Sequence, residues 1–128
     1  MTSPDMERPV ILLVEDDAAV VNALTFSLDL EGFDVRAYAD GESLLASKPL
    51  PSRGCLVLDY NLPGIDGLDL LERLRAAHVD LPVILITTNP RRALRARAAI
   101  AGVEIIEKPL LTDALCDSVR SALGAPAH

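Results

Sequence analysis

Residues 55–67 read CLVLDYNLPGIDG, and this stretch decides the fold. Its first four residues, 55–58, form a continuous apolar run of the kind found in strands that are buried on both faces. Asp59 ends the run, and residues 60–67 are rich in types that favour turns, with Asp66 in place to cap a following helix. A buried strand that leads through a turn into a helix is typical of a parallel β-α-β unit.

The same alternation of apolar runs and amphipathic segments continues in both directions along the chain. We predict further strands at residues 10–14, 33–39, 82–86 and 103–106. The helices are expected to follow Asp17, Asp40, Asp66, Asn89 and Thr112, and all of these but Asp40 are expected to act as caps. In the second strand, Phe33, Val35 and Ala37 alternate with polar residues. Connections of this length require parallel pairing, so the sequence predicts an α/β fold: a doubly wound five-stranded parallel sheet with five helices.

Composition excludes several classes of protein. A hydrophobic fraction of 50% in 128 residues supports one buried core and excludes a disordered chain. No apolar run approaches the length of about 18 residues that a transmembrane helix needs, and the start of the chain lacks the features of a secretory signal. The net charge of −7 and the aromatic content of 3% argue against direct nucleic-acid binding.

The chain has two cysteines, Cys55 and Cys116, which are too few for a disulfide framework or a zinc site. Cys55 begins an apolar run, and Cys116 lies in a helical pattern. We expect both to be reduced core residues of a cytoplasmic protein that makes no membrane contact.

Polar side chains follow four of the predicted strands. Glu15 and Asp16 come after the first strand, Asp59 after the third, Thr87 after the fourth and Lys108 after the fifth. The carboxyl ends of parallel strands meet at one edge of the sheet, so we expect these side chains to converge. Packed carboxylates repel one another, and Mg²⁺ with oxygen ligands and several waters relieves that repulsion. A carboxylate beside such an ion can attack a phosphoryl group, whose charge a lysine and a hydroxyl then neutralise.

Each of these residues alone has an ordinary explanation as a helix cap, a turn former or a surface side chain. Their joint position at one sheet edge favours a site. With this set of residues, the chain resembles the receiver domain of two-component response regulators, which has a flavodoxin-like fold. The segments that carry the resemblance are residues 11–17, 56–67, 82–87 and 107–109, and it covers about residues 8–123.

The resemblance implies a Mg²⁺ site. Asp16 would be a direct ligand, together with Asp59 and the backbone carbonyl of Asn61, and Glu15 would hold a metal-bound water. A hydrated site of this kind is expected to bind Mg²⁺ weakly in the absence of phosphate.

The resemblance also implies a phosphorylation reaction. Asp59 would accept a phosphoryl group from a histidine kinase or a phosphotransfer protein. Thr87 would bind a phosphoryl oxygen and shift, and Lys108 would pair with the phosphoryl group, its bond to Pro109 being cis. The chain would be a phospho-acceptor switch that controls a partner or an output domain, and it would catalyse only its own phosphorylation and dephosphorylation. Lys108→Ala is expected to cost little stability, because only a partly solvated ion pair is lost.

Three features depart from the family pattern, and all concern the output side. Ile105 stands where the family has its switch aromatic, and Thr88 stands where Ala, Gly or Ser is usual. The segment 102–108 is one residue shorter than in close relatives. Isoleucine is stiff at χ1 and has no ring to swing, so a gated aromatic movement is not expected.

Helical spacing places a small apolar stripe of Ala93, Ala96 and Ile100 on the outer face of the fourth helix. This stripe either reflects helix propensity alone or, with Ile105, packs against a partner or a second copy. We therefore expect a weak homodimer through the face of helix four, strand five and helix five.

Three other classes of protein stand as alternatives. A pseudo-receiver that only binds proteins would lack part of the acidic, hydroxyl and lysine set named above. A phosphatase similar to haloacid dehalogenases needs a second acidic residue where Asn61 stands. A flavin carrier needs a first loop that cradles phosphate, whereas residues 15–17 are all acidic and repel it.

The expected domain organisation is simple. Residues 1–8 form a short lead-in, residues 9–124 form the receiver domain, and residues 125–128 form a tail. No output domain is expected within these residues, and the sequence fits both a stand-alone regulator and an excised domain.

Overall fold

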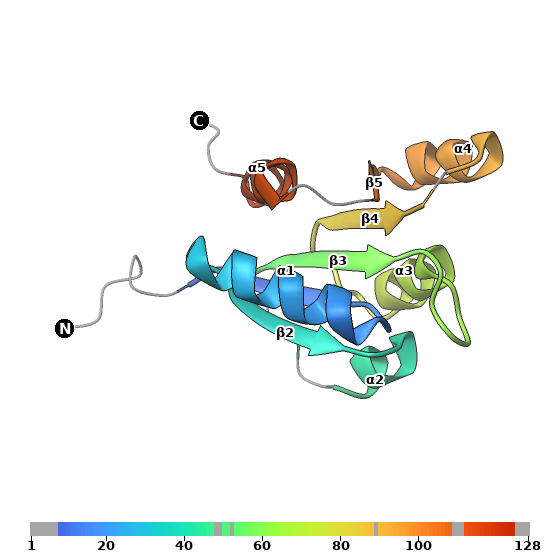
Figure 1. Ribbon diagram of the computed structural model, residues 1–128. Coiled ribbons are helices and arrows are strands. Elements are labelled where there is room, and N and C mark those ends of the chain that lie inside the picture. The colour runs from blue at the N-terminus through green and yellow to red at the C-terminus, as the bar shows by residue number, and fades with distance from the viewer. Residues whose placement is uncertain (1–7, 48–49, 52, 89, 109–111, 125–128) are drawn as a thin grey trace.

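The computed structural model describes residues 8–47, 50–51, 53–88, 90–108 and 112–124. Five parallel strands form one sheet in the order β2-β1-β3-β4-β5, as Figure 1 shows. The strands are β1 (Val10–Val14), β2 (Asp34–Tyr38), β3 (Cys55–Asp59), β4 (Val83–Thr87) and β5 (Glu104–Glu107). The predicted doubly wound fold is confirmed. No strand begins or ends more than one residue away from its predicted position.

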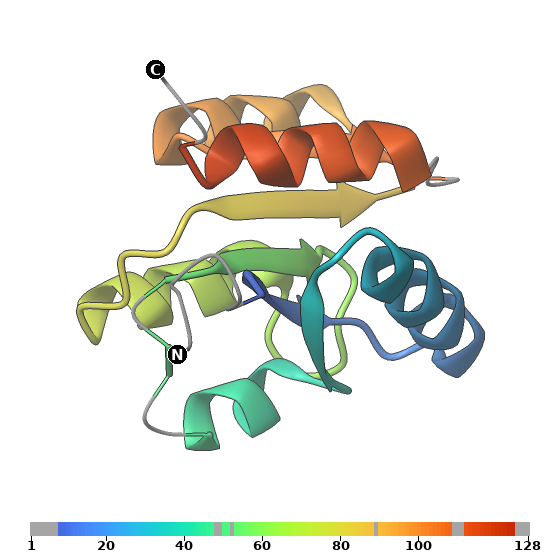
Figure 2. The same cartoon turned by 90° about the vertical axis from the view of Figure 1, so that its left-hand side faces the viewer.

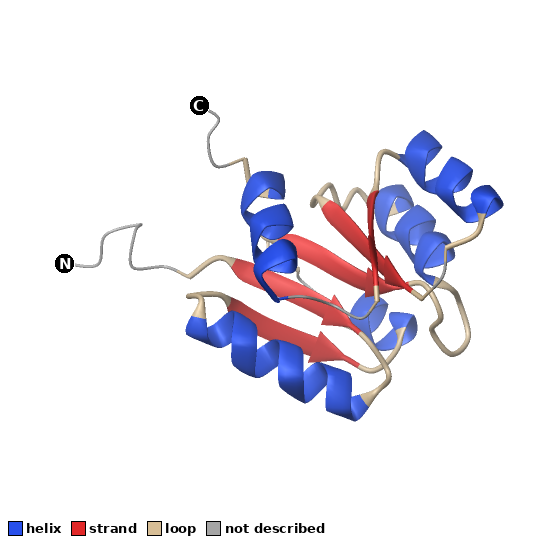
Figure 3. Cartoon of the chain, turned by 45° about the horizontal axis from the view of Figure 1, so that its top comes forward, coloured by secondary structure: helices blue, strands red, loops and turns tan. Residues whose placement is uncertain are grey.

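Helices cover both faces of the sheet, so that the strands form the middle of three layers (Figures 2 and 3). The helices are α1 (Ala18–Leu30), α2 (Gly41–Ala46), α3 (Gly67–Ala76), α4 (Arg92–Ala101) and α5 (Thr112–Ala122). Buried side chains of α1 and α5 share one hydrophobic cluster, and those of α2, α3 and α4 share the other.

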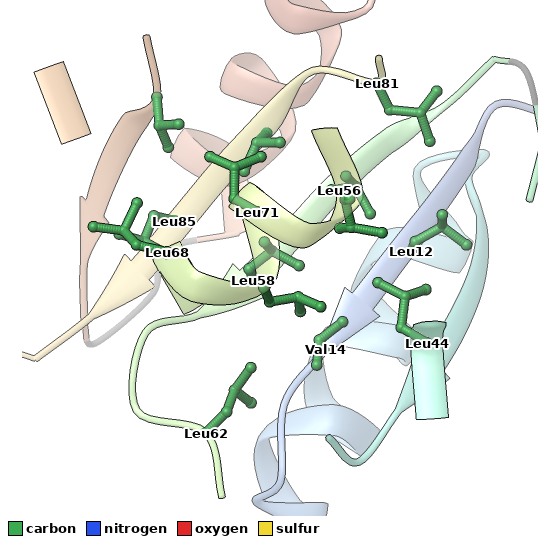
Figure 4. Close-up of a cluster of buried hydrophobic side chains, with 14 of the residues drawn as sticks. Leu12, Val14, Leu44, Leu56, Leu58, Leu62, Leu68, Leu71, Leu81 and Leu85 are labelled. Carbon is green, nitrogen blue, oxygen red and sulfur yellow. The ribbon is translucent and has the colours of Figure 1, made fainter. Parts of the chain in front are cut away.

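The two clusters draw alternate residues from the central strands. Ile11 and Leu13 of β1 face α1 and α5, whereas Leu12 and Val14 face the leucine-rich cluster drawn in Figure 4. All four side chains are buried. Burying a side chain of this size contributes about 1.5–3 kcal/mol, so the central strands are fixed in place by both layers.

Parallel pairing aligns the carboxyl ends of the strands. Leu58 pairs with Val14 of β1, Asp59 pairs with Ile86 of β4, and Thr87 pairs with Glu107 of β5. The residues that follow these positions therefore meet at one edge of the sheet, at the arrowheads in Figure 1.

β2 is an edge strand, and Ala37 in it is exposed. Two expectations about the later helices are wrong. Helix α4 begins at Arg92 with Arg91 as its cap residue, and the Arg91 side chain makes no capping hydrogen bond. The expected cap Asn89 lies outside the described residues, and Thr112 is the first residue of α5 rather than the residue before it.

The predicted caps at Asp17 and Asp66 are confirmed. Asp17 Oδ1 accepts a hydrogen bond from the Ala19 amide at 2.9 Å, and Asp66 Oδ1 accepts one from the Asp69 amide at 2.8 Å. Both cysteines are free and buried. In the part of the chain that the structure describes, no helix has the length and apolar character needed to cross a bilayer.

Candidate functional site

Glu15 and Asp16 directly follow β1. The Glu15 amide extends the sheet by donating to the Tyr38 carbonyl at 3.0 Å, and its side chain is only 1% exposed. Glu15 Oε2 accepts a hydrogen bond from the Asp17 amide at 3.1 Å, which fixes the carboxylate beneath the start of α1. Asp16, in contrast, is exposed. The two acidic neighbours therefore stand in different environments, one in the core and one at the mouth of the site.

Asp59 is the last residue of β3 and is 3% exposed. Its Oδ1 accepts a hydrogen bond from the Asn61 amide at 3.1 Å. The loop then returns to the strand end, because the Gly67 amide donates to the Tyr60 carbonyl at 3.0 Å. A Cβ atom at position 67 would lie 2.8 Å from the Asp59 carbonyl oxygen, so only glycine allows α3 to begin this close to the acidic residue.

Lys108 joins the two buried carboxylates. Its Nζ donates to Glu15 Oε1 at 3.1 Å and to Asp59 Oδ2 at 3.2 Å. The Lys108 amide donates to the Thr87 carbonyl at 2.8 Å, which holds the lysine at the end of β5 beside β4. The side chain is 22% exposed, so the ammonium lies at the boundary between the core and solvent.

Burial and charge shift two pKa values in this cluster. Burial raises the pKa of Glu15, and the adjacent Asp59 carboxylate raises it further. Burial alone would lower the pKa of Lys108, but its hydrogen bond to Glu15 and the charge of Asp59 raise it above the usual value. Lys108 is therefore charged at neutral pH, and its ammonium contacts two of the three acidic side chains, those of Glu15 and Asp59.

The donor set of this cluster fits Mg²⁺. Carboxylate oxygens of Glu15, Asp16 and Asp59 lie within 4.8 Å of one another. Hard oxygen ligands with few protein contributions and room for water are what Mg²⁺ prefers. The exposure of Asp16 leaves the outer side of the cluster open to water. These three residues could hold the ion, and its positive charge would offset the excess of carboxylates.

Thr87 is buried at the end of β4, next to β3 in the sheet. Its Oγ1 donates to the Thr88 carbonyl at 3.4 Å, and within the described residues it has no hydrogen bond to Asp59. Ile105 of β5 is half-buried and packs against the cluster that α4 contributes to. Ile100 of α4 is 89% exposed. The sheet edge thus brings together Glu15, Asp16, Asp59, Thr87 and Lys108, whereas Ile105 and Ile100 lie on the α4–β5 side.

An open pocket of about 450 Å³ adjoins Thr87. Asn61 lines it, together with Tyr60, Arg91 and Arg97, which were not predicted to lie at the site. Arg97 also pairs with Asp69 of α3 at 3.8 Å. The sequence carries no signal for this pocket, because its walls come from the β3–α3 loop and from α4, which begins later than predicted.

The buried ion pairs change the expectation for Lys108→Ala. Without the lysine, two buried carboxylates would face each other without a counter-ion. We expect the metal-free variant to lose about 1–3 kcal/mol of unfolding free energy, measured by urea denaturation, and Mg²⁺ to restore part of the loss. Arg73→Ala is the matched control, because Arg73 is an exposed cation of α3. Equal unfolding midpoints for the two variants would show that Lys108 does not support the fold.

Comparisons with known proteins agree with this geometry. The family model of the response regulator receiver domain matches residues 11–120. The chain is 36% identical over 114 residues to the transcriptional regulatory protein FixJ of Bradyrhizobium diazoefficiens, which covers 88% of this chain and 56% of FixJ. It is 41% identical over 114 residues to the C4-dicarboxylate transport transcriptional regulatory protein DctD of Pseudomonas aeruginosa, which covers 88% of this chain and 25% of DctD.

A solved structure shows the same likeness. Full-length FixJ from B. japonicum matches with a TM-score of 0.82 and 34% identity, covering 90% of this chain and 57% of that structure. The chain thus spans about half the length of FixJ and about a quarter of DctD. The sheet order, the acidic cluster at the strand ends and these matches lead to one conclusion: the chain belongs to the receiver domains of two-component response regulators.

Proposed function

We propose that Asp59 accepts a phosphoryl group from a phosphohistidine of a sensor kinase or a phosphotransfer protein. One observation carries this proposal: the buried Asp59 carboxylate ends β3 within reach of both a lysine ammonium and two further carboxylates. We place the exchange in the cytoplasm, and the free, buried cysteines support that placement.

In the proposed transfer, a carboxylate oxygen of Asp59 attacks the phosphorus. The new P–O bond forms as the P–N bond to the donor imidazole breaks, and the imidazole nitrogen takes the electron pair. Asp59 is held for this step, because the Asn61 amide binds Oδ1 and Lys108 binds Oδ2. Lys108 can turn its remaining N–H group toward a phosphoryl oxygen, and the Thr87 hydroxyl can leave the Thr88 carbonyl to bind another.

We infer that Mg²⁺ is held by Asp16, Asp59 and the backbone carbonyl of Asn61, with Glu15 acting through a water. When bound, Mg²⁺ supplies positive charge for the phosphoryl oxygens. Glu15 is better suited to the indirect role than Asp16, because its two oxygens already bind the Asp17 amide and Lys108. We also assign hydrolysis of the aspartyl phosphate to this chain, as its only other reaction.

The phosphorylation site is tested by intact mass after incubation with Mg²⁺ and a small phosphodonor. We expect one phosphate adduct on the wild-type chain and none on Asp59→Asn. Asp80→Asn is the matched control, because Asp80 is exposed and lies outside the cluster, and it should react like the wild type. An adduct that persists in Asp59→Asn would contradict the assignment.

The metal site is tested by thermal unfolding with and without Mg²⁺. Binding to the folded state should stabilise the wild type by about 2.7 kcal/mol at 100 times the dissociation constant. Asp16→Ala should lose most of this gain, whereas Asp80→Ala should keep it. If Asp16→Ala and the wild type show the same Mg²⁺-dependent shift, Asp16 is not a ligand.

We propose that the signal leaves through the face formed by α4, β5 and α5, by weak self-association. Ile100 stands out from α4 with the exposed Ala93 and Ala96, and the half-buried Ile105 lies on the neighbouring strand. A shift of Thr87 would act on this side, because the β4 end pairs with β5. On the same side of the molecule, Arg95 of α4 pairs with Glu107 of β5 at 3.5 Å.

Sedimentation velocity tests this face. A stable phosphate mimic should strengthen self-association of the wild type, and Ile100→Asp should abolish it by placing a charge in the contact. The matched control is Phe26→Asp, since Phe26 of α1 is also a large exposed side chain, at 68%, on the other face of the sheet. Identical sedimentation of the wild type and Ile100→Asp in both states would rule out this interface.

A further inference from the structure

A second concave feature lies at the opposite end of the sheet. It is an open pocket of about 720 Å³ whose lining includes residues that precede β1, β2 and β3. The amino-terminal ends of these strands lie on the left in Figure 1. Its walls include Arg8 before β1, Gly32 before β2 and Gly54 before β3, together with Gly124 after α5. The phosphorylation chemistry uses none of these residues.

The pocket is basic although the chain carries a net charge of −7. Among the described residues, its lining includes four arginines, Arg8, Arg36, Arg53 and Arg120, and one acidic residue, Glu31. Asp29 and Asp34 pair with two of these arginines from outside the lining, so the arginines still outnumber the carboxylates that contact them. These arginines come from four separate parts of the chain. Their proximity is therefore a result of the tertiary fold and not of a local run of charged residues in the sequence.

Two of the arginines are fixed in place by the protein. Arg8 Nη1 pairs with Asp29 at 3.0 Å, and its Nε donates to the Gly32 carbonyl at 3.1 Å. Arg120 Nη2 pairs with Glu31 at 3.0 Å, and its guanidinium lies 5.4 Å from the centre of the buried Phe33 ring. Two planar guanidinium groups are thus held at the walls of the pocket at little further cost in entropy on ligand binding.

The other two arginines have donors to spare. Arg36 makes one long contact with Asp34, at 3.6 Å. Among the described residues, Arg53 makes no ion pair. Both side chains can turn toward a ligand without breaking a strong interaction with another described residue. The forked donors of arginine match the oxygens of a phosphate group.

We propose that this pocket binds a small phosphorylated ligand of nucleotide size, whose phosphates pair with Arg36 and Arg53 and whose flat ring stacks on Arg120. The volume lies in the range of about 300–1,000 Å³ typical of small-molecule sites and is far larger than a phosphate ion needs. A guanidinium that is held in place offers a planar, cationic surface to a base.

Isothermal titration in buffer freed of metal with a chelating resin tests the proposal, with ADP as the probe. Without metal, the acidic cluster at the other end of the sheet repels phosphate. ADP should bind more tightly than inorganic pyrophosphate, which lacks the ring, and than adenosine, which lacks the phosphates. Arg53→Gln should weaken ADP binding about tenfold, because charge-assisted hydrogen bonds are lost. The control Arg73→Gln removes the same charge from α3 and should bind like the wild type.

Amide NMR locates the ligand. ADP should shift the resonances of Gly32, Gly54 and Gly124, and leave those of Gly64 and Gly67 unchanged. Arg53→Lys keeps the charge but loses the fork, so its affinity should lie between those of the wild type and Arg53→Gln. No binding of ADP at millimolar concentration, equal affinities for Arg53→Gln and Arg73→Gln, or shifts confined to Gly64 and Gly67 would overturn the proposal. Equal affinities for ADP and pyrophosphate would overturn the assignment of a ring site.

Discussion

The arrangement of the strand ends depends on one interaction, in which the Lys108 ammonium binds the buried carboxylates of both Glu15 and Asp59. Glu15 and Asp59 are nearly inaccessible to solvent, and Lys108 reaches both at 3.1 and 3.2 Å. A buried charge that loses its partner destabilises the fold, so the ends of β1, β3 and β5 must stay in register for the cluster to exist. The cluster is nevertheless short of positive charge, because Asp16 adds a third carboxylate. A divalent cation bound by these carboxylates would supply the missing positive charge.

The sequence predicts the site well because parallel sheets align chain segments in a simple way. Apolar runs identify β1, β3 and β4, and each run ends one residue before or at a polar side chain of the site. Glu15, Asp59 and Lys108 each lie at or just after the carboxyl end of a strand. Because the strands are parallel members of one sheet, these residues lie at the same edge of that sheet. The prediction that these side chains converge needs no knowledge of side-chain geometry, and the hydrogen bonds of Lys108 to Glu15 and Asp59 confirm it.

Features that depend on tertiary packing were not predictable in the same way. Nothing in the order of residues indicates that α4 begins without a side-chain cap at Arg91, or that Arg95 is paired with Glu107. The contact between Lys108 and two buried carboxylates follows from the depth of Glu15 in the core, which the periodicity of the sequence does not indicate. The arginine pocket is the clearest case. Arg8 and Arg120 lie near opposite ends of the sequence, yet both donate hydrogen bonds to carbonyl groups of the loop between α1 and β2, at Gly32 and Glu31.

The acidic and basic ends of the molecule are connected by the same rigid elements. Strand β3 follows Gly54 at the arginine pocket and ends at Asp59, a span of about 16 Å at the rise of an extended strand. Coupling between two distant sites requires an element that can adopt two discrete positions, and a strand buried on both faces is not suited to that. Helix α5 is the better candidate for such an element, because Arg120 contacts the pocket while Leu115 and Val119 pack on the sheet. A ligand that held Arg120 would bias the position of α5, which belongs to the same face as α4 and β5. Any effect of the arginine pocket on the acidic cluster would then pass through the proposed output face rather than through the strands.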